Sequence, residues 1–451
     1  MSQYKPYPAY KDSGVEWLGR VPEHWQLRRL KHMARFSGGG TPTRDNPEFW
    51  NGDIPWVSPK DMKSECITGA EECISAAGLA GSSSSMVPAE RVLLVVRSGI
   101  LKHTIPVAVN SVPVALNQDM KAIWLDSDYL SERFFMRWVQ GLNDDLLKVW
   151  LKQGATVESI EQEYLADTLM PVPPVNEREH IMQYLDRETA RIDALIEKKT
   201  RFIELLREKR QALITHAVTK GLDPKVKMKG SGVEWLGEVP EHWSICNVQH
   251  VIEKIEQGWS PDCLNTPAED GQWGVVKSGC VNGGIFNPQE NKALPVHLSP
   301  VPEYEIKIGD ILMSRASGSP ELIGSIALVK EASERLMLSD KIFRLQCSKK
   351  MVPAFFVMVM GARIVRAQVE QSISGADGLA NNLPQSRIKK FVIPCPPIRE
   401  QLEISSFVDT QASRLHELGE RTKRSIALLK ERRSALITAA VTGQIDLREA
   451  V

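Results

Sequence analysis

Two long segments of the chain carry the hydrophobic pattern of one helix face. In residues 176–219 apolar side chains recur at intervals that alternate between three and four, which is the period of an amphipathic helix. Residues 399–442 repeat the pattern: Pro173 recurs as Pro396 and Ala212 as Ala435, an offset of 223 residues in both cases. The two segments align without a gap, so the chain is expected to contain two matched helices.

Each predicted helix is too long to be covered by one small domain. A helix of roughly 40 residues extends ~60 Å at 1.5 Å per residue. Two helices with matching apolar stripes can cover each other, so we expect them to pair within the chain as an antiparallel coiled coil. Two alternatives remain open: each helix packs on its own neighbouring domain, or the helices mediate dimerisation.

A short motif, here called the tag, also occurs twice. Residues 13–25 read SGVEWLGRVPEHW and residues 231–243 read SGVEWLGEVPEHW, so the two tags differ only at Arg20 and Glu238. A packing or capping role is expected for His24 and His242, which belong to the tags. The duplicated frame suggests two recognition modules that are presented in related orientations to one asymmetric partner.

The regions between tags and helices, residues 26–170 (the first block) and 244–393 (the second block), look largely unlike each other. Short apolar runs at 92–96 and 311–313 predict strands, and Gly and Pro punctuate both blocks heavily. One faint echo links the blocks: LNQDMK at 116–121 parallels LSDK at 338–341. The blocks are therefore interpreted as diverged copies of one fold.

The predicted fold class is α+β, with two α/β-mixed domains separated by two long helices that pair as an antiparallel coiled coil in a pseudo-two-fold internal repeat. The expected boundaries are an N-terminal tag at 1–25, a first recognition domain at 26–172, a central helix at 173–222, a linker with the repeated tag at 223–243, a second recognition domain at 244–395 and a C-terminal helix at 396–451.

Composition places the chain among ordinary globular proteins. At 451 residues, two to four domains are expected, and 42% hydrophobic and 25% charged residues are typical values. The apolar runs are shorter than the ~18 residues of a membrane span, and the N-terminus lacks the apolar region of a signal peptide. Seven cysteines without Cys-x-x-Cys spacing favour reduced thiols and a cytoplasmic location.

The charge balance limits the ways in which the chain can bind nucleic acid. Lys plus Arg equals Asp plus Glu, 56 of each; the first block is slightly acidic and the second is near balance. A basic domain is the usual electrostatic mark of a DNA-binding protein. Any binding of nucleic acid is therefore expected to depend on local patches or on partner subunits that supply phosphate contacts.

Two short patterns in the first block imitate methyltransferase motifs. Residues 36–40 fit F-x-G-x-G, a methyl-donor-binding pattern, and residues 46–49 nearly fit N-P-P-[FY], with Glu48 in place of the second proline. A doubly wound methyltransferase needs strands and helices between its cofactor loop and its catalytic loop, and only five residues separate these patterns. We interpret them as a turn-rich surface loop and predict neither a cofactor nor a metal site.

The repeated tags, the PP-x-x-E sequence before each helix and the ALIT-x-AVT sequence near each helix end together resemble the specificity (S) subunit of type I restriction–modification enzymes. The resemblance covers essentially the whole chain, and residues 38–62 look like the opening of many recognition domains of that family. The second block departs from this opening, because Gly258-Trp259-Ser260-Pro261 lacks the Gly-Gly-Thr-Pro run.

The resemblance implies a non-catalytic subunit whose two domains each read one half of a bipartite double-stranded DNA target. It further implies that the helices dock methyltransferase (M) subunits, with two copies expected, and that restriction (R) subunits join this core. A stand-alone methyltransferase or nuclease is one alternative, and a coiled-coil scaffold without DNA contact is another.

Candidate DNA contacts follow from residue type and placement. Arg and Lys suit phosphate and guanine, and Asn and Gln suit adenine, when they are displayed on loops or at helix ends. The predicted contacts are Thr41, Thr43, Arg44, Lys60, Arg97 and Lys102 in the first block, and Lys277, Asn282, Arg315 and Ser317 in the second.

Overall fold

The computed structural model describes residues 5–152, 154, 156–331, 335–373 and 381–448. The chain divides into two compact units. The first unit comprises residues 1–200 and 424–451, and the second comprises residues 201–423. Each unit therefore contains one block, one tag and a part of each long helix.

The two long helices lie within one residue of their predicted ends. Helix α5 spans Val175–Lys220 and helix α9 spans Ile398–Val441. Each begins directly after a Pro-Pro pair, whose second carbonyl accepts the first helical hydrogen bond, Arg178 N to Pro174 O at 2.9 Å and Gln401 N to Pro397 O at 3.0 Å. Proline cannot continue a helix upstream, so the repeated Pro-Pro pair sets both starts.

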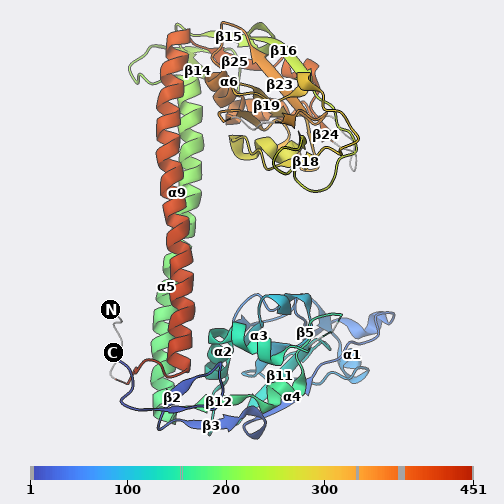
Figure 1. Cartoon of the computed structure of the whole chain (residues 1–451), viewed down its shortest axis with the longest axis vertical. Coiled ribbons are helices and arrows are strands. Elements are labelled where there is room, and N and C mark those ends of the chain that lie inside the picture. Colours follow the sequence, from blue (N-terminus) through green and yellow to red (C-terminus); the bar gives the residue numbers. More distant parts are fainter. Residues whose placement is uncertain (1–4, 153, 155, 332–334, 374–380, 449–451) are drawn as a thin grey trace. The chain divides into compact units, whose positions relative to one another are not determined.

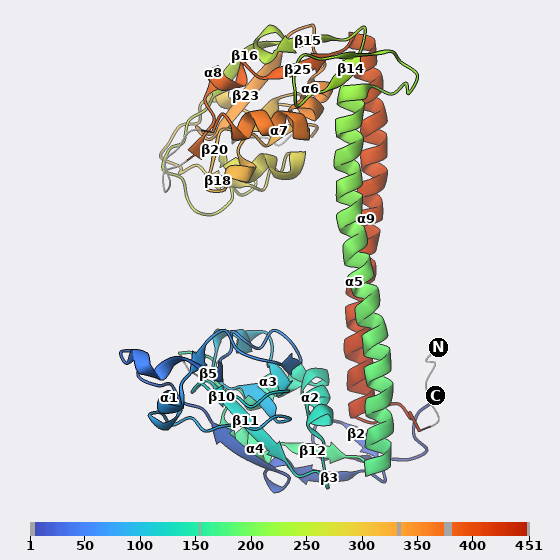
Figure 2. The ribbon, with the colours of Figure 1, turned by 180° about the vertical axis from the view of Figure 1, so that it is seen from behind.

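The helices pair with each other in antiparallel fashion. In the first unit Ile181 and Leu185, near the start of α5, share a core with Leu436 and Ala440, near the end of α9. In the second unit the end of α5 shares a core with the start of α9. Both ribbon views show the helices side by side (Figures 1 and 2). The prediction of an intramolecular antiparallel pair is confirmed.

Each tag forms the turn and the second strand of a hairpin, and the two hairpins match. The first hairpin contains β1 (Tyr10–Asp12) and β2 (Arg20–Pro22), and the second contains β13 (Met228–Gly230) and β14 (Glu238–Pro240), both antiparallel. A short strand follows each tag and pairs antiparallel with the strand that precedes the long helix: β3 (Gln26–Arg29) with β12 (Leu169–Val172), and β15 (Ser244–Asn247) with β25 (Val392–Cys395). This strand pair joins the beginning of each block to its end, next to the tag and the long helix.

The first block is built on a five-stranded sheet in the order β4-β11-β8-β9-β6 and a three-stranded sheet in the order β10-β5-β7. Helix α2 packs on β8 and β9, and Phe134, Phe135 and Trp138 of this helix are fully buried. The remaining elements are β4 (Ala34–Gly38), β5 (Trp50–Val57), β6 (Cys66–Ile67), β7 (Cys73–Ile74), α1 (Ala76–Ala80), β8 (Val92–Val95), β9 (Val107–Asn110), β10 (Ala115–Leu116), β11 (Met120–Leu125), α2 (Glu132–Gly141), α3 (Asn143–Trp150) and α4 (Gln162–Asp167).

The second block repeats this plan with a four-stranded sheet in the order β16-β23-β19-β21 and a three-stranded sheet in the order β18-β17-β22. The predicted strands at 92–96 and 311–313 are confirmed as β8 and β19. The elements are β16 (Ile252–Gln257), β17 (Gly274–Val276), η5 (Ser278–Gly284), β18 (Asn291–Ala293), β19 (Ile311–Ser314), β20 (Ala316–Ser317), β21 (Ile326–Leu328), β22 (Leu336–Met337), β23 (Ile342–Cys347), α6 (Pro353–Met360), α7 (Arg363–Glu370), β24 (Asn381–Asn382) and α8 (Gln385–Ile388).

The prediction of an α+β fold with mixed blocks and a repeated frame is confirmed. Among the described residues, no helix is both long enough and apolar enough to cross a membrane.

Candidate nucleic-acid interface

The tags anchor each block to the long helices through one carboxylate. Glu177, in the first turn of α5, accepts a hydrogen bond from Trp25 Nε1 at 2.9 Å and is bonded to His24 Nε2 at 2.8 Å. The same carboxylate accepts a hydrogen bond from the Tyr7 hydroxyl. Glu177 is buried, so these bonds satisfy a carboxyl group that would otherwise be costly to bury.

The second tag repeats this anchor. Glu400, in the first turn of α9, accepts a hydrogen bond from Trp243 Nε1 at 2.8 Å and is bonded to His242 Nε2 at 2.6 Å. The structure therefore gives both tag histidines a structural role in holding a tag to a helix start.

Each tag also meets the end of the other helix. A Cβ at Gly443, which follows α9, would lie 2.3 Å from Pro22 Cδ, and a Cβ at Gly221, which follows α5, would lie 3.3 Å from the Trp243 ring. Both glycines have positive φ, 72° and 75°, as is common for the residue that ends a helix. Each tag thus joins the start of one helix to the end of the other, and this arrangement positions the block that follows.

In the first block the opening loop packs against a turn formed by residues 116–119. A Cβ at Gly39 would lie 2.1 Å from the Asn117 carbonyl oxygen, so only glycine fits there. Gly40 N donates to Leu116 O at 2.9 Å, and the Thr41 hydroxyl donates to the Gln118 side chain. Within the turn, Asn117 Oδ1 accepts from Asp119 N at 3.0 Å. We name residues 116–119, and their counterparts 338–341, the shared turn.

In the second block the same contacts recur with other residues. A Cβ at Gly258 would lie 2.0 Å from the Leu338 carbonyl oxygen, and Trp259 N donates to that oxygen at 3.1 Å. The Ser260 hydroxyl donates to the Asp340 carboxylate. Gly258 therefore takes the place of Gly39. The second opening differs from the Gly-Gly-Thr-Pro run in its neighbouring side chains, while its backbone contacts are the same.

An arginine at a strand end completes each site. Arg97 N donates to Asp119 O at 3.3 Å, and Arg97 Nε donates to Asp119 Oδ1 at 2.6 Å. Arg315 N donates to Lys341 O at 2.8 Å, and Arg315 Nη1 donates to Asp340 O at 3.2 Å. The predicted residues Thr41 and Arg97 thus meet at one turn, and Arg315 lies at the matching turn.

The carboxylate of Asp340 is held in its charged form. Burial raises the pKa of this group, but hydrogen bonds from Ser260 and Lys341 and the charge of Arg315 outweigh burial and keep the pKa below its usual value. Gln118 occupies the equivalent position in the first block and is exposed. The two turns therefore offer different groups at one matched place, an amide in the first block and a carboxylate in the second.

Arg44 and its neighbours form a second cluster in the first block. The Arg44 guanidinium donates to both carboxylate oxygens of Glu72, at 2.7 and 3.0 Å, and lies 4.0 Å from the centre of the Trp50 ring. The Thr43 carbonyl accepts from Trp50 Nε1 at 3.2 Å, and the charge of Lys60 contributes to lowering the pKa of Glu72. The Glu72 hydrogen bond raises the pKa of Arg44.

The other predicted contacts lie apart from the shared turns. Lys102 is exposed at the end of a 3-10 helix, and Lys277 precedes η5, 4.0 Å from Glu290. Asn282 is exposed inside η5, and Ser317 Oγ accepts from Ser319 N at 3.2 Å within a local turn. None of the hydrogen bonds described for these four residues reaches a shared turn.

The near-match to a methyltransferase motif is a capped turn. The Asn46 side chain accepts a hydrogen bond from Glu48 N at 3.1 Å, at the start of a 3-10 helix spanning Pro47–Phe49. A Cβ at Gly78 would lie 2.3 Å from the Phe49 carbonyl oxygen, so this turn packs closely on α1. These contacts give residues 46–49 a structural role and agree with the interpretation as a surface loop.

Gln118, Ser260, Asp340 and Lys341 also lie at the shared turns, although they are not among the predicted contacts. The echo between residues 116–121 and 338–341 was the signal for them, because it marked the shared turn in both blocks.

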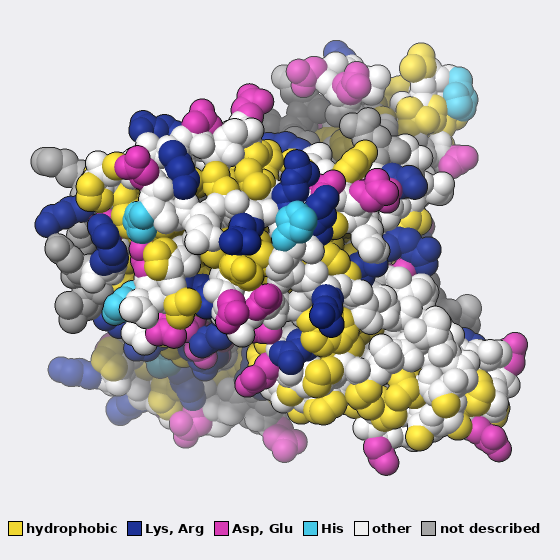
Figure 3. Space-filling view, turned by 90° about the horizontal axis from the view of Figure 1, so that it is seen from below, with side chains coloured by type: hydrophobic (Ala, Val, Ile, Leu, Met, Phe, Trp, Pro, Cys, Tyr) yellow, Lys and Arg dark blue, Asp and Glu magenta, His cyan; other side chains and the backbone are white. Residues whose placement is uncertain are grey.

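Lys and Arg side chains are interspersed with Asp and Glu on the face seen in Figure 3, as the balanced composition suggests. Within the described ranges, no group of three or more His, Cys, Asp and Glu side chains could hold a metal ion.

The chain has two non-identical blocks with one matched site each, and an antiparallel helix pair carries both blocks. This arrangement defines a class of proteins with two recognition modules on one pair of helices. Residues 22–205 match the family model described as "Type I restriction modification DNA specificity domain". This part of the chain therefore resembles the DNA specificity domain of type I restriction–modification systems.

The chain is also similar to individual specificity subunits. The EcoR124I/EcoR124II specificity subunit of Escherichia coli is 34% identical over 198 residues, 44% of this chain and 46% of that protein, so the alignment spans less than two thirds of this relative. The MjaVIII specificity subunit of Methanocaldococcus jannaschii is 22% identical over 95% of both chains.

A solved structure described as "Structural basis underlying complex assembly and conformational transition of the type I R-M system" has the same fold. It superposes with a TM-score of 0.69 at 15% identity, covering 94% of this chain and 99% of the other.

Proposed function

We propose that this chain is the DNA-recognition subunit of a type I restriction–modification complex, and that each block reads one half of a bipartite double-stranded DNA target. The observation that carries the proposal is the shared turn. Both blocks hold the same glycine, hydroxyl and arginine around it, while the side chain at its third position differs. Such a repeat suits two half-sites of different sequence.

The chemistry of the third position matches base recognition. An amide such as that of Gln118 can bind adenine N6 and N7 in the major groove, and a carboxylate such as that of Asp340 can accept from cytosine N4. Arg97, Arg315 and Thr41 stand beside these groups. The other predicted contacts, Thr43, Arg44, Lys60, Lys102, Lys277, Asn282 and Ser317, are proposed to position the phosphate backbone.

In this function the chain performs no chemistry and needs no cofactor of its own. The M subunits supply methylation and R subunits join the assembled core, in the cytoplasm. Two M subunits are proposed, because exposed apolar side chains occur at repeat-matched positions of the helices: Leu195 and Leu418 are 40% and 45% exposed, and Leu205 and Leu428 are 45% and 64% exposed. Matched surfaces suit two copies of one partner.

The test is to map methylation by the complex reconstituted with M subunits on a library of random DNA sequences. Gln118→Ala should relax the choice of base at one position of the first half-site, and Asp340→Ala should do so in the second, each by roughly tenfold or more. Lys148→Ala, on α3 and paired with Asp145 at 3.2 Å, is the control and should leave both half-sites unchanged. Relaxation of neither half-site by either turn variant would exclude base reading at the shared turn.

A further inference from the structure

In the first unit a network of ion pairs closes the junction between the block and the helix pair. Arg433 of α9 donates to Asp193 of α5, with Nε to Oδ1 at 2.9 Å, and to Glu65 of the first block, with Nη2 to Oε1 at 2.9 Å. Arg137 of α2, whose side chain is 6% exposed, donates to the same oxygen of Glu65 at 2.6 Å. The Glu65 carboxylate is therefore shared by two guanidinium groups, one from the block and one from the helices.

The internal repeat shows which residues stand at these places in the second unit. At the offset of 223 residues, Arg210 corresponds to Arg433 and His416 corresponds to Asp193. Matching Phe134-Phe135 of α2 to Phe355-Phe356 of α6 places Met358 where the first unit has Arg137. The second unit thus keeps one arginine of the network but has neither its second arginine nor the acid on the neighbouring helix.

The element that supplies Glu65 is also replaced. Glu65 directly precedes β6, which pairs with β9 at the edge of the first sheet. In the second unit η5 packs on β21, the counterpart of β9. Where this segment faces the helices it reads Gly283-Gly284-Ile285-Phe286 and presents no carboxylate.

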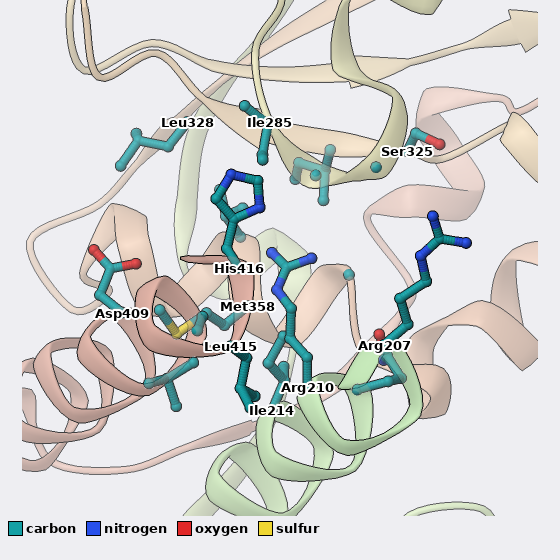
Figure 4. A pocket seen from close by; sticks show the side chains of 18 of the residues that line it. Arg207, Arg210, Ile214, Ile285, Ser325, Leu328, Met358, Asp409, Leu415 and His416 are labelled. Carbon is teal, nitrogen blue, oxygen red and sulfur yellow. The ribbon is translucent and has the colours of Figure 1, made fainter. Parts of the chain in front are cut away.

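The junction in the second unit is a cavity of about 960 Å³. The Arg210 guanidinium and the His416 ring point into it, and Ile285 and Leu328 lie on its opposite wall (Figure 4). Arg207 also lines the cavity. Within the part of the chain that the structure describes, neither Arg207 nor Arg210 is paired with a carboxylate.

Two of the four acids that line the cavity, Asp409 and Glu420, already have cationic neighbours, and the other two, Glu321 and Glu331, form no ion pair with Arg210 among the described residues. Asp409 lies 2.7 Å from Lys330, and Glu420 lies 2.7 Å from Lys423. The unpaired guanidinium of Arg210 is therefore the group that an incoming carboxylate would complete, as Glu65 completes that of Arg433.

We propose that this cavity receives a carboxylate-bearing segment of a partner protein, which occupies in the second unit the place that Glu65 occupies in the first. The cavity falls within the ~300–1,000 Å³ of binding clefts and combines cationic groups with apolar side chains. The internal template is itself a polypeptide carboxylate, which favours a protein segment over a free anion. The identity of the partner, an M subunit, rests on the proposed function.

The proposal makes the two M subunits unequal. In the first unit the chain's own Glu65 fills the junction, so only the M subunit at the second unit inserts an acidic segment. The decisive variant is His416→Asp, which recreates the Arg433–Asp193 pair within the second unit. This pair already exists in the first unit, so the variant should fold, and the new carboxylate should compete with that of the partner for Arg210.

The experiment titrates purified M subunit onto the full chain and counts bound copies by native mass spectrometry. His416→Asp and Arg210→Glu should each weaken the binding of one of two copies by roughly tenfold, the effect of losing one charge-assisted hydrogen bond. Lys209→Glu makes the same charge change on an exposed neighbour outside the cavity and should titrate like the unmodified chain. Circular dichroism checks the folding of each variant.

The possible outcomes separate the cavity from the proposed function. Unchanged titration of both cavity variants, or equal weakening of both copies, would overturn the carboxylate-docking proposal. Failure of the unmodified chain to bind any M subunit would count against the proposed function itself.

Discussion

At the scale of single residues, the shared turn depends on a glycine that packs against a carbonyl group. Gly39→Ala would place a Cβ 2.1 Å from the Asn117 carbonyl oxygen. The turn must shift, and overpacking of this kind lowers the free energy of unfolding by about 1–3 kcal/mol. Gly38→Ala is a matched control, because a Cβ at Gly38 would have no atom within 4 Å. Urea unfolding followed by tryptophan fluorescence should separate the two, and equal stability of both variants would contradict the role of Gly39.

The same residues show where prediction from the sequence stops. The two openings share only a glycine, a hydroxyl residue and a proline, and Trp259 stands where the first block has Gly40. The match rests on the turn carbonyl that each glycine meets, Leu116 O in the first block and Leu338 O in the second, and this contact lies about 80 residues away in the chain. Candidate selection by residue type could therefore find Thr41, Arg97 and Arg315, but it could not show that they share a turn with Gln118 and Asp340.

At the scale of elements, the two tag anchors are alike in chemistry but unequal in burial. The Glu177 side chain is 7% exposed and has Tyr7 as an additional donor, whereas the Glu400 side chain is 33% exposed. Leaving buried donors without their acceptor costs about 1–3 kcal/mol, and partly exposed donors can turn to water. Glu177→Ala should therefore lower the urea midpoint more than Glu400→Ala. The opposite order would show that the tags are held mainly by apolar contacts.

The ion network of the first unit predicts a pH-dependent contribution to stability. Burial raises the pKa of Glu65, but Arg137 and Arg433 outweigh burial and hold the pKa below its ordinary value of 4.5. A lowered pKa in the folded state stabilises the fold at neutral pH, and this contribution is lost as the pH falls through the folded-state pKa. Glu65→Gln should therefore destabilise the chain by about 1–3 kcal/mol at pH 7 and by progressively less below pH ~4.

The control for Glu65 lies in the same block. Glu71 pairs with Lys63 at 2.7 Å, but both side chains are exposed, 59% and 72%. Exposed pairs of this kind contribute ~0–1 kcal/mol, so Glu71→Gln should have little effect at any pH. Urea midpoints of both variants between pH 3 and pH 8 check the prediction, and parallel curves for Glu65→Gln and the unmodified chain would refute it.

The long helices were the most predictable elements. Their apolar period, the Pro-Pro starts and the repeat in register are all local signals, and the observed ends differ from prediction by one residue. The contacts of the tags with both helices were not predictable in this way, because they join Trp25 to Glu177 and Pro22 to Gly443 across large separations in the chain.

At the scale of the whole molecule, the chain passes from one unit to the other within the two long helices, at repeat-matched positions. The first unit ends at Thr200 and resumes at Arg424, and the second begins at Arg201 and ends at Lys423. Thr200 and Lys423 are separated by the repeat offset of 223 residues. Both crossings lie inside long helices, α5 and α9, so we propose that the helix pair acts as a ruler between the two half-sites.

Inserting four residues after Thr200 and four after Lys423 tests the ruler hypothesis. Four residues are about one helical turn, which preserves the apolar face and adds ~6 Å at 1.5 Å per residue. Since B-DNA rises ~3.4 Å per base pair, the spacer between half-sites should grow by one or two base pairs while both half-sites stay the same. An insertion in α5 alone should instead mismatch the two stripes and lower the thermal stability. Methylation mapping of the reconstituted complex gives the readout, and an unchanged spacer with altered half-sites would show that the helices do not set the distance.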